Sequence, residues 1–176
     1  MRTYKITSLK ELDKFKDDLG YTIDGNAEFS FNVVLDGRLK VEGYLWIEAG
    51  SWIKAGSWIE AGSWIKAGSW IEAGDWIEAG DSIEVLRGGI TVGTSLSCKG
   101  SLKFALKLFA GTSPYSWCAD CSKEVRCGKL EGGTIVYGDL VETGLPDAPK
   151  ETIEIGGIKY DKDEVEAKLK DIKPIR

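Results

Sequence analysis

The chain of 176 residues contains no histidine. This absence excludes Ser-His-Asp and Cys-His catalytic groups, histidine-ligated metals and an imidazole general base. No run of about 18 apolar residues could span a membrane, and the N-terminal residues lack the apolar segment of a signal peptide. The net charge of −5 argues against nucleic-acid binding, which requires clustered lysine and arginine. The sequence therefore predicts a cytoplasmic protein that binds neither nucleic acid nor a membrane.

A six-residue repeat occupies the middle of the sequence. Each copy has isoleucine, then Glu or Lys, alanine, glycine, Ser or Asp, and usually tryptophan. The isoleucines are Ile47, Ile53, Ile59, Ile65, Ile71 and Ile77, and Ile83 starts a seventh copy that lacks the alanine and the glycine. A glycine at every sixth position excludes a helix, and the β-branched and aromatic neighbours favour short strands. Weaker copies extend the repeat over residues 29–113, with a one-residue insertion near 86–89.

The pattern aliphatic–(Glu/Lys)–Ala–Gly–Ser–X resembles the hexapeptide repeat of left-handed parallel β-helices. The resemblance implies a triangular coil made of three hexads, about 18 residues in all, with the aliphatic residue inside and glycine at the turn. The fold class that we expect is thus an all-β solenoid, a left-handed parallel β-helix. Residues 29–113 would form roughly four to five coils.

The charges after each isoleucine independently favour a coil of three hexads. With this period the pairs Asp36–Lys54, Glu48–Lys66, Lys54–Glu72 and Lys66–Glu84 are of opposite sign. A coil of two hexads would instead place like charges side by side, which destabilises neighbouring strands.

Both flanks of the repeat are expected to cap the solenoid. Residues 1–28 would form a strand over 2–7 and a helix over 8–19, with Ser8 as N-cap and Glu11 as its partner in a capping box. Gly20 would end that helix.

The C-terminal part is expected to contain three segments. Residues 114–139 would form a cysteine-containing coil or cap, and 140–151 a linker with two prolines. Residues 152–176 would form a hairpin–helix element, with the hairpin over 152–160 and a helix from Asp161 to Pro174.

Six tryptophans are candidates for an interaction surface. With three hexads per coil they form three outward pairs: Trp46 with Trp64, Trp52 with Trp70, and Trp58 with Trp76. Such rows can simply stabilise the stacking of coils, but their number favours a protein interface, with self-association into a dimer or trimer. The face of Trp52 and Trp70 is the best candidate seam, because the charges along it alternate in sign.

A row of Glu42, Glu60 and Glu78 is predicted on the third face. A solvated acidic surface is the ordinary interpretation. The alternative is a face that binds a basic partner. Because these residues belong to a repeat, they indicate a scaffold rather than a catalytic pair.

The four cysteines are a further candidate site. Cys118 and Cys121 have the spacing of a zinc knuckle, and Cys127 and Cys98 could complete four thiolate ligands. Buried or free thiols and a disulfide are the alternatives. Beyond this possible structural zinc, no cofactor is predicted.

Runs such as Trp-Ile-Lys-Ala-Gly-Ser and Ser-Ile-Glu-Ala-Gly, within residues 35–136, resemble small proteins encoded by phages and prophages of Gram-positive bacteria. The role of those proteins is unassigned. Acyltransferases and carbonic anhydrases with β-helices use a histidine that this chain lacks, so we expect no enzymatic activity. We expect an oligomeric binding protein that docks an intracellular host protein, such as a bacterial immune effector. The alternatives are a sequestrator of nucleotide-like ligands between subunits and a phage accessory structural protein.

Overall fold

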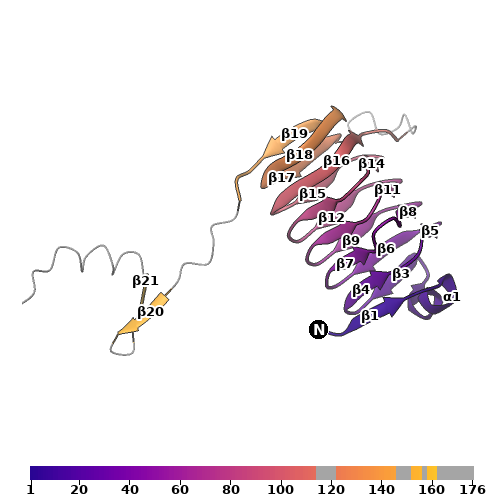
Figure 1. Cartoon of the computed structure of the whole chain (residues 1–176), viewed down its shortest axis with the longest axis horizontal. Helices are drawn as coiled ribbons and strands as arrows, with labels where there is room; N and C mark the ends of the chain where they lie inside the picture. The colour runs from indigo at the N-terminus through magenta and orange to yellow at the C-terminus, as the bar shows by residue number, and fades with distance from the viewer. Residues whose placement is uncertain (114–121, 146–151, 156–157, 162–176) are drawn as a thin grey trace, which may run out of the picture. The chain divides into compact units, whose positions relative to one another are not determined.

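A computed structural model describes residues 1–113, 122–145, 152–155 and 158–161 (Figure 1). The chain divides into two units, Met1–Leu145 and Pro146–Arg176. The first unit is a parallel β-solenoid of about seven turns with about 19 residues per turn. In the second unit, β20 (Thr152–Ile155) and β21 (Ile158–Asp161) pair in antiparallel fashion, which confirms the predicted hairpin. The helix predicted after it lies outside the described residues.

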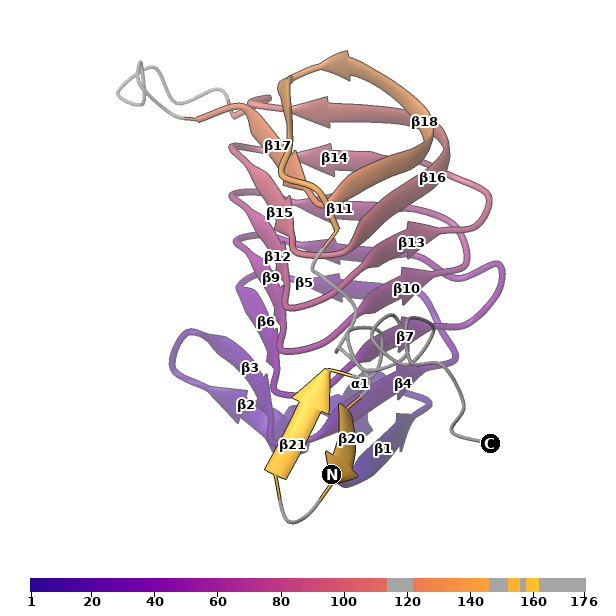
Figure 2. The ribbon, with the colours of Figure 1, turned by 90° about the vertical axis from the view of Figure 1, so that its left-hand side faces the viewer.

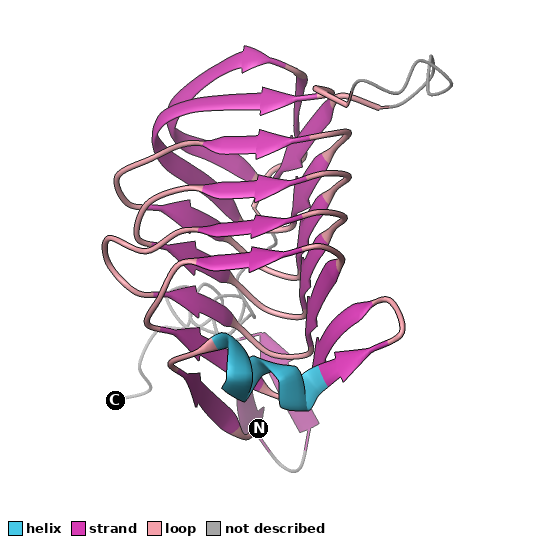
Figure 3. Cartoon of the chain, turned by 90° about the vertical axis from the view of Figure 1, so that its right-hand side faces the viewer, coloured by secondary structure: helices cyan, strands magenta, loops and turns pink. Residues whose placement is uncertain are grey.

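Three faces of stacked parallel strands build the solenoid (Figures 2 and 3). The first face consists of β1 (Thr3–Ile6), β4 (Asn26–Phe29), β7 (Leu45–Ile47), β10 (Ile65–Ala67), β13 (Ile83–Val85) and the start of β16 (Ser101–Ala110). The second face consists of β5 (Val33–Leu35), β8 (Ile53–Ala55), β11 (Ile71–Ala73), β14 (Ile90–Val92) and the end of β16. The third face consists of β3 (Gly20–Ile23), β6 (Arg38–Val41), β9 (Ile59–Ala61), β12 (Ile77–Ala79), β15 (Leu96–Cys98), β17 (Glu124–Cys127) and β19 (Asp139–Glu142).

Each three-residue strand of the repeat contributes two side chains to the core. In β10, Ile65 and Ala67 are buried and Lys66 points outward, because successive side chains of a strand alternate between its two sides. The same alternation in the other strands makes one continuous column of aliphatic side chains. No polar or charged residue is buried within the part of the chain that the structure describes.

The predicted offset of three hexads between neighbouring coils holds in the centre of the solenoid. Lys54 lies beside Glu72, and Lys66 lies beside Glu84. Earlier in the chain the offset is two residues longer, because Lys54 also lies beside Val34, and Lys66 beside Trp46. The predicted pairs Asp36–Lys54 and Glu48–Lys66 are therefore wrong.

A long corner between β7 and β8 causes this difference. Leu45, and not Ile47, is equivalent to Ile53, so this step takes eight residues and the following steps take six. The extra residues are accommodated by Gly50, whose φ of +90° is easily reached only without a side chain, and by Ala49, which is exposed. The one-residue insertion predicted near 86–89 is confirmed, since Ile71 lies beside Ile90.

The N-terminal segment forms the first coil as well as a cap. The helix α1 covers only Leu9–Leu12 and continues as a short 3-10 helix, η1 (Asp13–Phe15). The predicted helix over 8–19 is thus too long, because β2 (Lys16–Asp17) follows and pairs with β3. At the helix start, the backbone N–H and hydroxyl of Thr7 donate to Glu11, at 2.7 and 2.9 Å, whereas the Ser8 side chain makes no cap.

The solenoid continues past the repeat boundary predicted at residue 113, through the described part of the coil or cap predicted over 114–139, and beyond it. β18 (Lys129–Tyr137) pairs with β16, and β19 pairs with β17. Residues 140–142 therefore belong to the last coil and not to a linker. Because strands on both flanks continue the ladders, the number of turns exceeds the predicted four to five.

Candidate functional site

Five tryptophans occupy equivalent corner positions, immediately before a strand. They are Trp52, Trp58, Trp64, Trp70 and Trp76. The rings of Trp52 and Trp70 stack with centroids 5.4 Å apart, and those of Trp58 and Trp76 stack at 4.6 Å. Both pairs confirm the period of three hexads.

The predicted pair of Trp46 and Trp64 is wrong. Trp46 lies in the middle of β7, beside Lys66, whereas Trp64 stacks on Tyr44 at 4.3 Å with the rings 4° from parallel. The long corner before β8 shifts both residues relative to the repeat. The stack of Tyr44 on Trp64 would be visible in the sequence only if an offset longer than three hexads were considered.

Trp70 is the most exposed of the corner tryptophans. Its exposed fraction is 45%, while Trp52, Trp58, Trp64 and Trp76 are half-buried. Trp52 covers one face of the Trp70 ring. The stack of Trp58 and Trp76 is covered at one end by the Arg38 guanidinium, 5.1 Å from the centre of the Trp58 ring.

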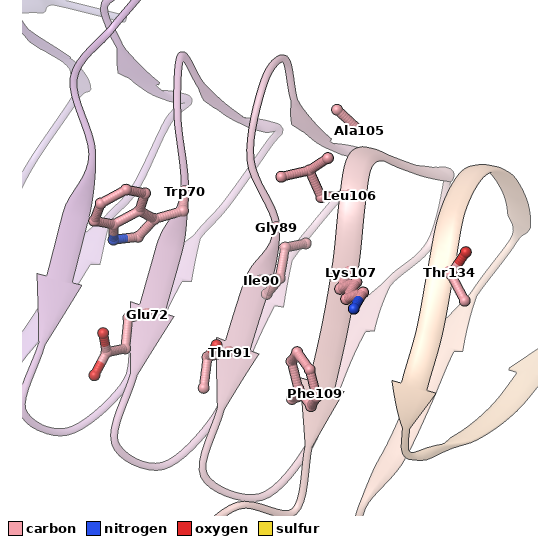
Figure 4. Close-up of a pocket in the computed structure, with 10 residues that line it drawn as sticks. All are labelled: Trp70, Glu72, Gly89, Ile90, Thr91, Ala105, Leu106, Lys107, Phe109 and Thr134. Carbon is pink, nitrogen blue, oxygen red and sulfur yellow. The ribbon is translucent and has the colours of Figure 1, made fainter.

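A shallow groove of about 710 Å³ lies next to Trp70 on the second face (Figure 4). Glu72 and Thr91 line it from β11 and β14, and residues of β16 line its far side. The side chains that define its ends are Trp70, Leu106, Lys107 and Phe109. At its centre is Gly89, which occupies the corner position between Trp70 and Lys107. The groove is therefore a gap in the column of corner side chains.

Charge is distributed unequally over the three faces. On the first face Glu84 binds Lys66 at 2.7 Å and Lys103 at 3.7 Å, and the hydrogen bond from Lys66 lowers the pKa of Glu84. On the third face Lys40 binds Glu60 at 3.1 Å.

The second face has one described ion pair, between Lys54 and Glu72 at 2.7 Å. Its remaining outward strand positions hold Val34, Thr91, Phe109 and Tyr137. This face is consequently the least charged side of the solenoid.

The predicted acidic row does not form as expected. Glu60 lies beside Glu78, but its other neighbour is Lys40 and not Glu42. Glu42 lies after the end of β6, in the following corner. The long corner again explains the error, because it moves the partner of Glu60 by two residues. The row therefore begins with a cation and contains two carboxylates.

The described cysteines belong to the core. Cys98 stands next to Ala79 in the inward column of the third face, and Cys127 is the inward residue at the end of the next strand. Burial, together with the nearby Cys127, raises the pKa of Cys98 to about 12, so its thiol is protonated at neutral pH. Burial also raises the pKa of Cys127.

The predicted zinc site stays a prediction, because Cys118 and Cys121 lie outside the described residues. Among the residues that are described, no three potential metal ligands lie together.

No family model matches the chain, and no match was found among curated proteins or solved structures. Within the described segments, no helix has the length and apolar character needed to cross a membrane.

Proposed function

We propose that this protein is a non-enzymatic binding module that docks another protein on the second face of its solenoid. The observation that carries the proposal is the stack of the half-buried Trp52 with the exposed Trp70 on the least charged face. Tryptophan is enriched among the residues that dominate binding energy, and charged residues are depleted at the centre of interfaces. On the first face Glu84 pairs with two lysines, and the third face carries the pairs Lys40–Glu60 and Arg126–Glu124, so both faces are well suited to solvent.

The backbone beneath this face supports the proposal because neighbouring coils hold it. The N–H of Ile53 donates to the carbonyl of Trp70 at 3.2 Å, and the N–H of Ile71 donates to the carbonyl of Gly89 at 3.2 Å. Each corner is thereby fixed to the next one. A surface that is already ordered loses little conformational entropy when a partner binds.

Two partners are proposed for this face. One is a second copy of the chain, which gives a dimer or trimer. The other is a host protein in the bacterial cytoplasm, with an immune effector as the proposed target. The resemblance of the hexads to phage and prophage proteins supports the latter. The groove lies within one chain, so it lends no support to a ligand site between subunits.

Light scattering of the double variant Trp52→Ser/Trp70→Ser tests self-association. The wild type is expected to be oligomeric at tens of micromolar and the variant monomeric. The matched control is Trp58→Ser/Trp76→Ser, which removes an equivalent stack from another corner and should leave the oligomer intact. A monomeric wild type would remove the second copy as a partner.

Photo-crosslinking from the second face tests the host partner. A photoreactive amino acid at Thr91 should give a defined adduct in host cells, whereas the same group at Glu78 on the third face should not. Adduct formation from both positions, or from neither, would contradict the proposal.

A further inference from the structure

The corner column of the second face has one missing side chain. Trp52 and Trp70 fill two successive corners, Gly89 follows, and Lys107 fills the corner after it. Neighbouring coils are about 4.8 Å apart, so Trp70 and Lys107 are separated by about 10 Å. A planar ring between them would lie about 3.5–4 Å from Trp70, which is the distance of van der Waals contact.

The backbone excludes a side chain of the protein itself from this gap. A Cβ atom on Gly89 would overlap with the carbonyl oxygen of Lys107 in the next coil. The other stacks differ, because the next corner after Trp64 holds Ser82 and the next corner after Trp76 holds Ser95. Trp70 is thus the corner tryptophan whose outer ring face adjoins a glycine.

The charge around the gap is positive. The Glu72 carboxylate is held by Lys54 at 2.7 Å, which neutralises it. Lys107 makes no ion pair with any described residue. A ring that enters the gap therefore meets an indole face on one side and, on the other, an ammonium group with which no residue of the described segments pairs.

We propose that this gap receives an aromatic side chain of the docked protein that carries an adjacent carboxylate, such as a tryptophan beside an Asp or Glu. The inference rests on the proposed docking function and names the chemistry that the second face recognises. Leu106, with an exposed fraction of 61%, and Phe109 supply apolar contacts at the edge of the ring.

The shape of the groove favours a side chain over a free small molecule. Sites for small ligands usually enclose most of the ligand surface. Here the groove is shallow and open to solvent, so a ring in it would contact Trp70, Lys107 and the residues at the groove edge only. The missing contacts must come from a protein surface around the ring. A single inserted aromatic side chain surrounded by weaker contacts is the usual form of a binding hot spot.

Protein-observed NMR with small probes tests the gap directly. N-acetyl-L-tryptophan, which has a ring and a carboxylate, should shift the amide signals of Gly89, Thr91 and Lys107 with a Kd of about 1 mM. N-acetyl-L-tryptophan amide, which lacks the charge, should bind about five-fold more weakly. N-acetyl-L-leucine, which lacks the ring, should give no saturable shift.

Three variants assign the effect to named side chains. Trp70→Ala should abolish binding of the charged probe. Lys107→Gln should give N-acetyl-L-tryptophan and its amide the same Kd. Trp76→Ala is the matched control and should bind as the wild type does. Trp70 and Lys107 are exposed and Trp76 is half-buried, and melting curves would confirm that each variant folds.

Several results would overturn the inference. They are the absence of saturable shifts at Gly89, binding that survives Trp70→Ala, and tighter binding of adenosine 5′-monophosphate, which would assign the gap to a nucleotide. The docking function fails separately. If the Trp52→Ser/Trp70→Ser variant loses its oligomer or its crosslinked adduct while the gap binds no probe, the docking face stands and only the aromatic gap is wrong.

Discussion

Single residues determine where the surface of this solenoid is filled and where it is open. At the corners of the second face, Trp70 presents an indole and Gly89 presents a hydrogen atom, although the backbone positions are equivalent. Inside the solenoid, Cys98 occupies the inward position that Ala79 holds in the neighbouring strand, and the column of buried side chains stays continuous. Changes at such positions should therefore have effects that are set by their immediate neighbours.

The thiol of Cys98 should make the protein sensitive to alkali. Its pKa is raised to about 12 in the folded state from an ordinary value of 9.0, so the unfolded chain loses this proton first as the pH rises. The stabilising contribution is complete below about pH 9 and is lost above it. The wild type should lose unfolding free energy between about pH 8 and pH 10. In Cys98→Ala, which has the same residue as the neighbouring Ala79, this decrease should be smaller by about 1 kcal/mol.

Urea denaturation of both proteins at several pH values measures this difference. Parallel pH profiles for the wild type and Cys98→Ala would contradict the prediction, since other titrating groups are common to both chains.

The neighbouring carboxylates of the third face offer a stabilising substitution. Glu60 lies between Lys40 and Glu78, so Glu78→Lys would give a row with alternating charge. We expect a gain of about 0.5 kcal/mol in unfolding free energy, which should disappear at high salt. Chemical denaturation at low and high salt measures it, with Glu48→Lys in the long corner as the control for net charge. An equal gain from both variants would show that the row itself contributes nothing.

The elements of the fold are short strands. The sequence predicts their order, but it does not predict which residue begins each strand before the long corner. Alternation and glycine spacing correctly predicted short strands in the regular hexads from Ile53 to Val85. The repeat does not reveal the long corner, because Ile47-Glu48-Ala49-Gly50 has the same residue pattern as a regular hexad. Leu45 and Ile47 are both inward and both apolar, so composition does not reveal which of them begins the strand. The errors at Trp46 and Glu42 all follow from this one corner.

Removal of Glu48 and Ala49 should convert the long corner into a regular one. The remaining order Ile47-Gly50-Ser51-Trp52-Ile53 matches Ala55-Gly56-Ser57-Trp58-Ile59 except at the first residue. Because the strands keep their neighbours, we expect cooperative unfolding with a free energy within about 1 kcal/mol of the wild type.

The control deletes Gly56 and Ser57 from a regular corner. There the connection has no residues to spare, so the following strand would have to slip by two residues. Ile59 would then move into the corner, and Ser63 would take an inward position in the core. Circular dichroism and thermal melting compare the two deletions. If both unfold the protein, or neither does, the assignment of the long corner is wrong.

At the scale of the whole molecule, the solenoid supplies its own core. All residues of the buried cluster lie between Ile6 and Cys127, and the cluster includes Leu12 of α1. Figure 3 shows the helix across one end of the solenoid. The repeat predicted this architecture, and the sequence also predicted a coil or cap over 114–139. The coil formed by residues before 29 and the pairing of β19 with β17 were not predicted, because those sequences are not repetitive. Those coils are specified by pairing with a neighbour, as in β17 and β19, and not by a local pattern.

A chain that ends at Leu145 should therefore keep its stability. The unit Met1–Leu145 contains the complete buried cluster, and we expect its melting temperature to lie within about 2 °C of that of the full chain. The control ends at Ala110, which removes β17, β18 and β19 and uncovers Phe104 and Leu108, and it should melt at a much lower temperature. A large decrease for the chain ending at Leu145 would show that Pro146–Arg176 stabilises the solenoid.

The near-identity of the central hexads has a consequence for inheritance. Genes that encode tandem copies gain or lose copies readily during replication. Where a coil of this solenoid is three hexads long, a change of three hexads adds or removes one coil and leaves every column on its own face. A change of one hexad shifts every later strand to the next face. Gly89 and Lys107 would then no longer lie in the same corner column as Trp52 and Trp70. The solenoid can therefore change in length in steps of one whole coil. The geometry of the coil determines which changes in copy number preserve the fold and its surface.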